Sequence, residues 1–451
     1  MIQPTLVFLH ALGSSRREWE PVCQHIGDAP CIALDLPGFG ERIDEGYADV
    51  AAMADDLADT IRHHRLTASI LVGHSMGGKI ATIVAARAAA GEIGLAGVVG
   101  VVLVAASPPS PEPMEEERRT QMIGWVDSGS IGQEDAETFV KANTASALPP
   151  ERHDRAVADV QASSREAWLG WLERGSLEDW SGQVGRISIP ALIVAGSEDG
   201  DLNVDAQRQL NAPHYRHADI RVVDGAAHMI PFEQPEALAR LLADHAASLS
   251  SSILPVGFVD ILSSDRVSRR TRAAMLERTR PVSDTGLPWS EAERATVETL
   301  IAHILPEDVS THDLARRIEV VIVQGPGDGW RFADLPPDPE AWRQGLLTLD
   351  TLTGGFTALD HQARSEWLDR IAAGGQDAAV DTGPLSPKQM ALWFQDVRAE
   401  VVRQWAALPS TMAAIGYDGF AVGGDGPRNQ GYRRTGANDV EAWQMVEEKI
   451  A

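Results

Sequence analysis

Cysteine, basic charge and long apolar runs are all scarce in this chain. Its two cysteines, Cys23 and Cys31, are too few for a disulfide framework and lack the second pair of a zinc site, which predicts buried, reduced thiols. Lysine and arginine number 39 against 65 aspartates and glutamates, a net charge of -26 that repels nucleic acid and anionic lipid. No stretch reaches the roughly 18 apolar residues that span a bilayer. These absences argue against nucleic-acid and membrane partners and favour a small neutral substrate.

A secretory signal is also missing from the N-terminus. The segment MIQPTLVFLHALG has no basic start and no cleavage site, and it reads as a core strand. We therefore expect a cytoplasmic protein. A length of 451 residues predicts two or three domains, and the 44% hydrophobic and 23% charged residues are typical of folded protein.

Short apolar runs alternate with helical patterns in the first half of the chain. This arrangement predicts a mostly parallel sheet covered by helices on both faces. Each run ends near a glycine, a polar residue or a proline-rich turn. The expected strands are residues 5–10, 31–36, 69–72, 101–105, 191–195 and 219–223.

A long polar insertion separates the fourth expected strand from the fifth. It covers about residues 108–185 and places Trp168, Trp171 and Trp180 at helical spacing. We interpret it as a helical cap over a pocket. The tryptophans are expected to pack the cap onto the sheet domain in preference to contacting substrate.

The serine-rich stretch SLSSS, residues 248–252, is suited to a domain connection. We therefore predict a first domain of residues 1–249 and a second of residues 250–451. The second has no strand alternation but several helix starts. Ser290 with Glu293, and Ser386 with Gln389, are capping boxes, so this domain is predicted to be mostly helical.

The sequence GHSMG, residues 73–77, follows the apolar strand and precedes a helical run. This is G-x-S-x-G in its strand-turn-helix setting, where glycines permit a strained turn that exposes the serine oxygen above the sheet edge. Ser75 is therefore the predicted nucleophile. The backbone N–H of the next residue, Met76, is the expected first donor to an oxyanion.

A serine nucleophile needs a base that is oriented by an acid. The loop GSEDGD after the fifth strand offers the acids Glu198, Asp199 and Asp201, and His228 follows the sixth strand. Both loops lie at the carboxyl ends of strands, where sites of parallel sheets are found. The chain order serine, acid, histidine matches that of a nucleophile-elbow hydrolase.

These motifs together resemble the α/β-hydrolase family, over residues 1 to about 245. The resemblance implies an α/β fold with Asp199 as the acid, Asp201 being the alternative, and His228 as the base. The early loop HALG is similar to the family's H-G-x-G turn and implies Leu12 as the second oxyanion donor. Ala11 stands where that turn usually has glycine, and we expect His10 to be structural.

The second half resembles the gluconate 2-dehydrogenase subunit 3 family. The segments that carry the resemblance are residues 289–308, 355–371 and 408–432. Members are small non-catalytic subunits of flavin-dependent dehydrogenases of the glucose-methanol-choline type, so the resemblance implies that this domain docks a flavoprotein. We expect the glycine-rich residues 416–427 to form a surface loop, because no phosphate-binding lysine accompanies them.

The tryptophans of this half can be core residues or interface anchors. Core is the prediction for most of them, and Trp330, in a glycine-rich loop, is the better interface candidate. They are Trp330, Trp342, Trp367, Trp393, Trp405 and Trp443.

We therefore expect a cofactor-free serine hydrolase, a carboxylesterase or lactonase that acts on a small ester or lactone. A lactone is also what a flavin dehydrogenase makes from a sugar hemiacetal. Two alternatives remain open: a non-catalytic scaffold or accessory subunit of an oxidoreductase, and a C–C bond hydrolase with the same triad. Related esterases, haloperoxidases and lyases of the fold are also compatible with these residues.

Overall fold

The structure is a computed structural model that describes residues 3–282, 288–306, 309–325, 331–374, 383–420, 425 and 436–437. The chain folds into two compact units. A hydrolase unit comprises Met1–Arg280 with the described residues from Asp418 onward, and a helical unit comprises Pro281–Tyr417. Among the described residues, no helix combines the length and apolar character needed to cross a membrane.

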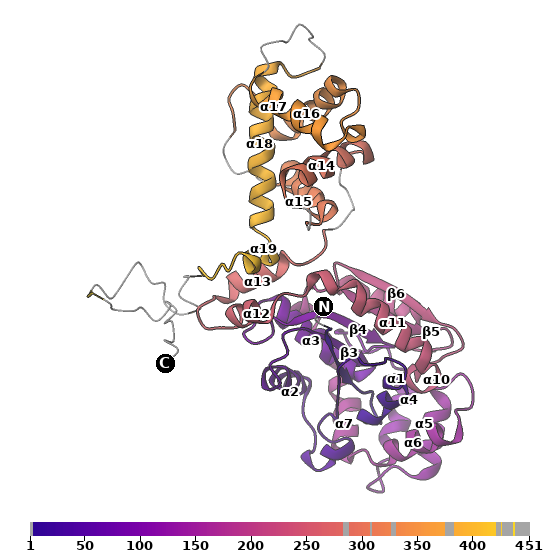
Figure 1. The fold of residues 1–451 in the computed structure, drawn as a ribbon. Helices are drawn as coiled ribbons and strands as arrows, with labels where there is room; N and C mark the ends of the chain where they lie inside the picture. The colour runs from indigo at the N-terminus through magenta and orange to yellow at the C-terminus, as the bar shows by residue number, and fades with distance from the viewer. Residues whose placement is uncertain are drawn as a thin grey trace. The chain divides into compact units, whose positions relative to one another are not determined.

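Six parallel strands form the centre of the hydrolase unit (Figure 1). Their order is β2-β1-β3-β4-β5-β6. All six predicted strands are confirmed, although β3 continues to His74 and β4 begins at Val98, earlier than expected. Their bounds are β1 Thr5–Leu9, β2 Cys31–Leu34, β3 Ser69–His74, β4 Val98–Val104, β5 Ala191–Gly196 and β6 Ala218–Val223.

Alternate residues of the strands pack against helices on opposite faces of the sheet. Leu71 and Leu103 belong to a core shared with α2 (Val50–His63) and α3 (Met76–Ala89). The opposite face packs on the short helix α1 (Glu20–Cys23) and on α11 (Pro235–Ser248). Because both faces are covered, the central strands are apolar along their whole length, as in other buried parallel sheets.

The insertion between β4 and β5 is helical, as predicted. Trp168 is fully buried, and its Nε1 donates a hydrogen bond to the Met122 carbonyl at 2.8 Å. Trp171 is also buried in the core that the cap shares with α2 and α3, as expected, but it lines the cavity beside Ser75 as well. The cap helices are α4 Glu116–Gly124, α5 Gln133–Ala142, α6 Pro150–Gln161, α7 Arg165–Glu173 and α8 Ser181–Val184.

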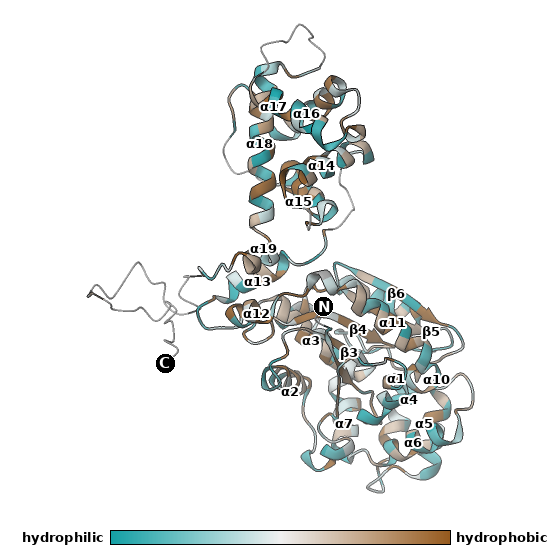
Figure 2. Ribbon diagram, viewed as in Figure 1, coloured by the Kyte–Doolittle hydropathy of each residue, from teal (hydrophilic) through white to brown (hydrophobic). Residues whose placement is uncertain are grey.

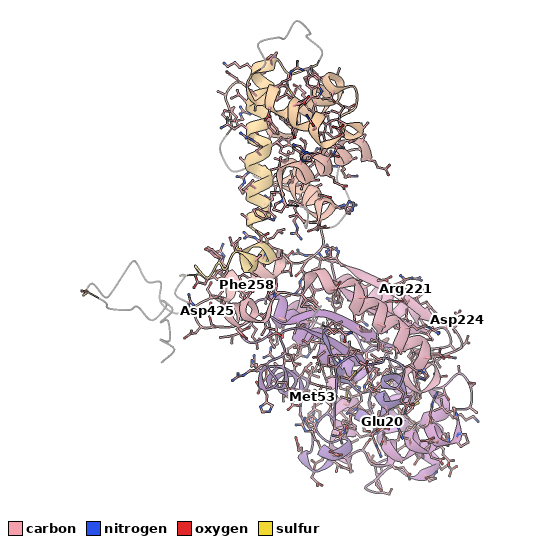
Figure 3. The ribbon with its side chains drawn as sticks, viewed as in Figure 1. Glu20, Met53, Arg221, Asp224, Phe258 and Asp425 are labelled. Carbon is pink, nitrogen blue, oxygen red and sulfur yellow. The ribbon has the colours of Figure 1, made fainter. Side chains whose placement is uncertain are left out.

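The predicted boundary near Ser250 is wrong, because helices α12 (Val256–Leu262) and α13 (Arg269–Glu277) belong to the hydrolase unit. The ring of Phe258 of α12 packs edge-on against Phe420, with ring centroids 5.9 Å apart, and the backbone N–H of Arg269 donates to the Asp425 carboxylate at 2.7 Å. Phe258 and Asp425 are labelled in Figure 3. The polar composition of residues 248–252 indicated a connection, but the tertiary contacts that follow it could not be seen in the sequence.

Arg272 holds α13 in place. Its side chain is 1% exposed and donates to the carbonyls of Gly91 at 2.6 Å, Ser264 at 3.1 Å and Val267 at 2.8 Å. Those carbonyls lie beyond the ends of α3 and α12, where helices leave acceptors unpaired. One guanidinium therefore satisfies several buried acceptors at once.

Replacing Arg272 with methionine should lower the free energy of unfolding of the hydrolase unit by about 2–4 kcal/mol, because buried carbonyls lose their donors. Urea unfolding followed by circular dichroism measures the change. Arg270→Met, at an exposed position of the same helix, is the matched control and should stay within about 0.5 kcal/mol of wild type. Equal losses in both variants would contradict the proposed role of Arg272.

The helical unit has a hydrophobic core of its own. Trp289 stacks on Trp342 with ring centroids 5.7 Å apart, and Trp342 and Trp393 are fully buried. Hydrophilic and hydrophobic residues alternate in short bands along α18, the pattern of a helix with one buried face (Figure 2). The helices are α14 Glu291–Ile304, α15 Thr311–Gln324, α16 Asp338–Thr353, α17 His361–Ala372, α18 Pro387–Ala406 and α19 Pro409–Ala414.

Both predicted capping boxes are confirmed. Ser290 and Glu293 exchange side-chain and backbone hydrogen bonds at the start of α14, and Ser386 and Gln389 do so at the start of α18.

A buried ion pair joins α14 to α15. The Glu319 carboxylate accepts a hydrogen bond from Arg294 Nε at 2.8 Å.

The structure also tests the predictions for the tryptophans of the second half and for the two cysteines. Trp367 and Trp405 are half-buried, while Trp330 and Trp443 lie outside the described residues, as does half of the glycine-rich segment 416–427. Both cysteines are free thiols, but Cys31 is exposed and Cys23 is only partly buried. The prediction of burial was wrong because Cys31 begins β2, which is an edge strand of the sheet.

Candidate active site

The predicted nucleophile lies in a sharp turn between β3 and α3. Ser75 has φ 48° and ψ −118°, a conformation that L-residues rarely adopt. A Cβ at Gly73 would lie 2.4 Å from the Gly77 carbonyl oxygen, and one at Gly77 would lie 2.5 Å from the Leu9 oxygen. The glycines of the motif are therefore required by close backbone approach, and the strain holds the Ser75 side chain at the edge of the sheet.

The structure places Asp199 against His228. Their contact joins Asp199 Oδ2 to His228 Nδ1 at 2.9 Å, and both side chains are largely buried. The other carboxylate oxygen of Asp199 accepts from the backbone N–H groups of Asp201 and Leu202, each at 3.1 Å. The alternative acid, Asp201, forms an ion pair with Arg118 of the cap instead. Of the two candidates, Asp199 is the one in contact with the histidine.

Burial and charge act in opposite directions on this pair. Burial lowers the pKa of His228, but the Asp199 charge and hydrogen bond, together with Glu112, outweigh it and leave the pKa raised above its ordinary value. Burial likewise raises the pKa of Asp199, and the His228 charge and the hydrogen bonds reverse this, so the pKa is lowered. The arrangement favours a charged imidazolium beside a charged carboxylate, the state a general base passes through.

Ser75 and His228 line the same cavity, about 100 Å³ in volume, but their side chains form no hydrogen bond with each other. Such contacts are often long in unliganded sites and shorten when substrate binds. Leu12 lines this cavity too, and Met76 is the first residue of α3. The predicted oxyanion donors thus flank the nucleophile.

The early loop accommodates Ala11 without strain. The described non-glycine residues with positive φ are Arg65, Ser75 and Ala105, so Ala11 keeps an ordinary backbone. The neighbouring His10 is fully buried and accepts a hydrogen bond from the backbone N–H of Leu36 at 3.0 Å. This contact agrees with a structural role for His10.

The cap supplies residues that sequence reasoning missed. The Asn143 carbonyl accepts from the N–H groups of His228 at 3.1 Å and Met229 at 3.0 Å, and Arg118 donates to the Asn143 side chain at 3.0 Å. Buried Lys79, one turn after the nucleophile, donates to the cap carbonyls of Gly175 and Glu178. No local motif marks these positions, because only the folded cap brings them to the site.

The cavity is rich in carboxylates. Arg118 is the only lysine or arginine among the described lining residues, and it is paired with Asp201. Glu112 accepts a hydrogen bond from the Ser107 hydroxyl at 3.2 Å, and burial raises its pKa against the opposing effect of the nearby His228, Lys79 and Arg119 charges. The lining acids are Glu18, Glu112, Glu198, Asp199 and Asp201.

A parallel sheet with a strained serine elbow, an acid–histidine pair and a helical cap is the arrangement of an α/β hydrolase. Residues 6–241 match the model of the alpha/beta hydrolase family, more than half of the 451 residues. The chain belongs to that family.

Curated relatives match over shorter segments. The chain is similar to 2-succinyl-6-hydroxy-2,4-cyclohexadiene-1-carboxylate synthase of Enterobacter sp. (strain 638), with 40% identity over 92 residues, 20% of this chain and 36% of that protein. The same synthase of Yersinia pseudotuberculosis is 40% identical over 81 residues, 17% of this chain and 29% of that protein. The matches thus span only about a third of the relatives' length.

Two solved structures are similar to part of this chain. The esterase from Exiguobacterium antarcticum has 19% identity and a TM-score of 0.48, covering 55% of this chain and 93% of the esterase. MenH from S. aureus has 19% identity and a TM-score of 0.44, covering 54% of this chain and 94% of that one.

Proposed function

We propose that this protein is a serine carboxylesterase for small, uncharged esters. The observation that carries the proposal is the contact between Asp199 and His228 in the same cavity as the strained Ser75. These contacts support the choice of catalytic residues, and the choice of ester bonds is part of the proposal.

The proposed reaction has two halves. Ser75 Oγ attacks the ester carbonyl while His228 takes its proton, and the N–H groups of Leu12 and Met76 stabilise the oxyanion. The intermediate collapses to an acyl-serine when His228 returns the proton to the departing alcohol. Water then attacks the acyl carbonyl with His228 again as base, which releases the acid and restores the Ser75 hydroxyl.

The charge of the cavity favours an uncharged substrate. An anionic acyl chain would face the acids that line the cavity, and the one lining arginine, Arg118, is already paired with Asp201. Like charges placed together discriminate strongly against a ligand. The small volume, about 100 Å³, suits a short acyl group.

A lyase is the second candidate, because of the name of the curated relatives. Their product, as named, contains a succinyl and a carboxylate group, both acidic. That chemistry fits the acidic cavity of this chain less well than a neutral ester does, so we place ester hydrolysis first.

The proposed role of the helical unit is to bind a partner protein. It has its own core of buried tryptophans, and the expected likeness to a dehydrogenase subunit makes a flavoprotein of the glucose-methanol-choline type the proposed partner. A lactone formed by such a dehydrogenase is a cyclic ester, which the same triad opens by the same steps.

Ethyl butanoate and monoethyl succinate test the proposed function. The two esters have acyl chains of similar length that differ in charge, and we expect kcat/KM for ethyl butanoate to be at least about tenfold higher because of charge repulsion. Aldonolactones assayed beside them rank lactone against ester. Faster turnover of monoethyl succinate would reverse the charge argument, and an inert protein would remove the esterase proposal.

A further inference from the structure

A buried glutamate and histidine lie beside the proposed triad. His74, the second residue of the serine motif, ends β3, and Glu18 lies in the short helix Arg16–Trp19 after the early loop. The His74 Nδ1 atom is 3.2 and 3.3 Å from the two carboxylate oxygens of Glu18, and each side chain is only 1% exposed. Both residues line the cavity that holds Ser75.

The other nitrogen of His74 reaches the proposed base. His74 Nε2 lies 2.9 Å from the backbone carbonyl oxygen of His228. A carbonyl oxygen only accepts hydrogen bonds, so Nε2 carries a proton and donates it. The remaining nitrogen faces the Glu18 carboxylate, and a second proton, lying between Nδ1 and the carboxylate, makes this contact a hydrogen bond that fixes the orientation of the ring.

The His228–Met229 peptide is consequently held at both ends. Its carbonyl accepts from His74, and its N–H, on Met229, donates to the Asn143 carbonyl at 3.0 Å. The His228 side chain is held separately by Asp199. Main chain and ring are thus fixed by different partners, which come from the nucleophile strand, the cap and the acid loop.

A buried carboxylate and imidazole are expensive to desolvate, and apolar side chains of similar volume would fill the space at less cost. The neighbouring Trp19 is fully buried and lies edge-on to the His74 ring at 6.3 Å, so the surroundings are apolar. The specific use visible for the pair is the hydrogen bond to the His228 carbonyl.

We propose that Glu18 and His74 are positioning residues that fix the main chain of His228, so that its imidazole can both take the Ser75 proton and deliver it to the leaving group. This inference rests on the proposed esterase function. It predicts a loss in chemistry rather than in substrate binding, because the polar atoms of the two side chains are engaged with each other and with the His228 carbonyl.

Two esters with the same acyl group test the role. Ethoxide must be protonated by His228 to leave, whereas 4-nitrophenolate leaves without a proton, so a misplaced His228 harms ethyl butanoate more. For His74→Leu we expect kcat/KM, which reports the acylation of Ser75, to fall roughly 10- to 100-fold on 4-nitrophenyl butanoate. The fall on ethyl butanoate should be about tenfold larger still.

Matched variants separate positioning from folding. His74→Gln keeps a donor that can reach the His228 carbonyl and should restore kcat/KM to within about fivefold of wild type. The kcat/KM of Glu18→Gln should lie between the values for His74→Leu and His74→Gln. His245→Leu removes a partly buried histidine of α11 and serves as the unrelated control, with no change in the ratio of the two substrates. Stoichiometric labelling of Ser75 by a fluorophosphonate corrects every rate for the active fraction.

Equal losses on both esters after His74→Leu, or no loss at all, would overturn the positioning role. A wild-type protein inert on both esters would instead sink the proposed function. In that case the low-field proton NMR signal of His228 Nδ1–H still decides the role. It should shift or broaden in His74→Leu and persist in His74→Gln, and an unchanged signal in both variants would refute the inference.

Discussion

Ser75→Ala should lower kcat for 4-nitrophenyl butanoate by about 10⁴-fold or more, because losing the nucleophile of a triad removes nearly all catalysis except that of the oxyanion donors. The Ser75 hydroxyl forms no hydrogen bond with the described side chains, so its loss leaves no buried partner unsatisfied. Steady-state rates measure the loss, and an unchanged thermal midpoint shows that the fold is intact.

Ser14→Ala is the matched control for this variant. Ser14 lines the same cavity and is buried, but it lies in the early loop and not at the elbow. Its replacement should change kcat by no more than a few fold. If Ser75→Ala kept a tenth of wild-type activity while Ser14→Ala lost it, the nucleophile would be assigned to the wrong serine.

Asp199→Asn should lower kcat by about 10³- to 10⁴-fold, since an amide at this position orients the wrong tautomer of the histidine. Asp199 raises the pKa of His228, so removing its charge should also lower that pKa. The base must be neutral to act, and the acidic limb of the residual kcat/KM profile should therefore move to lower pH. A pH–rate profile from pH 5 to 9 measures both effects.

Asp201→Asn separates the two acids of the same loop. Asp201 is paired with Arg118 and does not contact His228, so its amide variant should keep kcat within about tenfold and leave the acidic limb in place. The reverse outcome, with the larger loss and the shifted limb in Asp201→Asn, would transfer the role of the acid to Asp201.

Much of the site was predictable because its chemistry depends on local structure. The glycines around Ser75 are needed for close backbone approach within one turn, and that need is visible as G-x-S-x-G between a strand and a helix. His228 follows the last strand, and every parallel strand carries its C-terminal loop to the same sheet edge. Capping boxes such as Ser290 with Glu293 are equally local.

The choice between Asp199 and Asp201 was not local. The two carboxylates are neighbours in one loop, and only the positions of His228 and of the cap residue Arg118 separate them. The position at which the hydrolase unit ends also depends on contacts between distant segments. Buried hydrogen bonds from Arg272 to carbonyls such as that of Gly91, remote in sequence, keep α13 with the first unit beyond the serine-rich connection.

The sequence by itself determined the parallel sheet, the serine elbow and the order of the triad candidates, because backbone geometry and hydrophobic pattern act over a few residues. The tertiary structure alone decided which acid meets His228, where the hydrolase unit ends and what surrounds Ser75. Those features depend on contacts between segments distant in the chain, such as that of His74 with Glu18, whose partners no local pattern specifies.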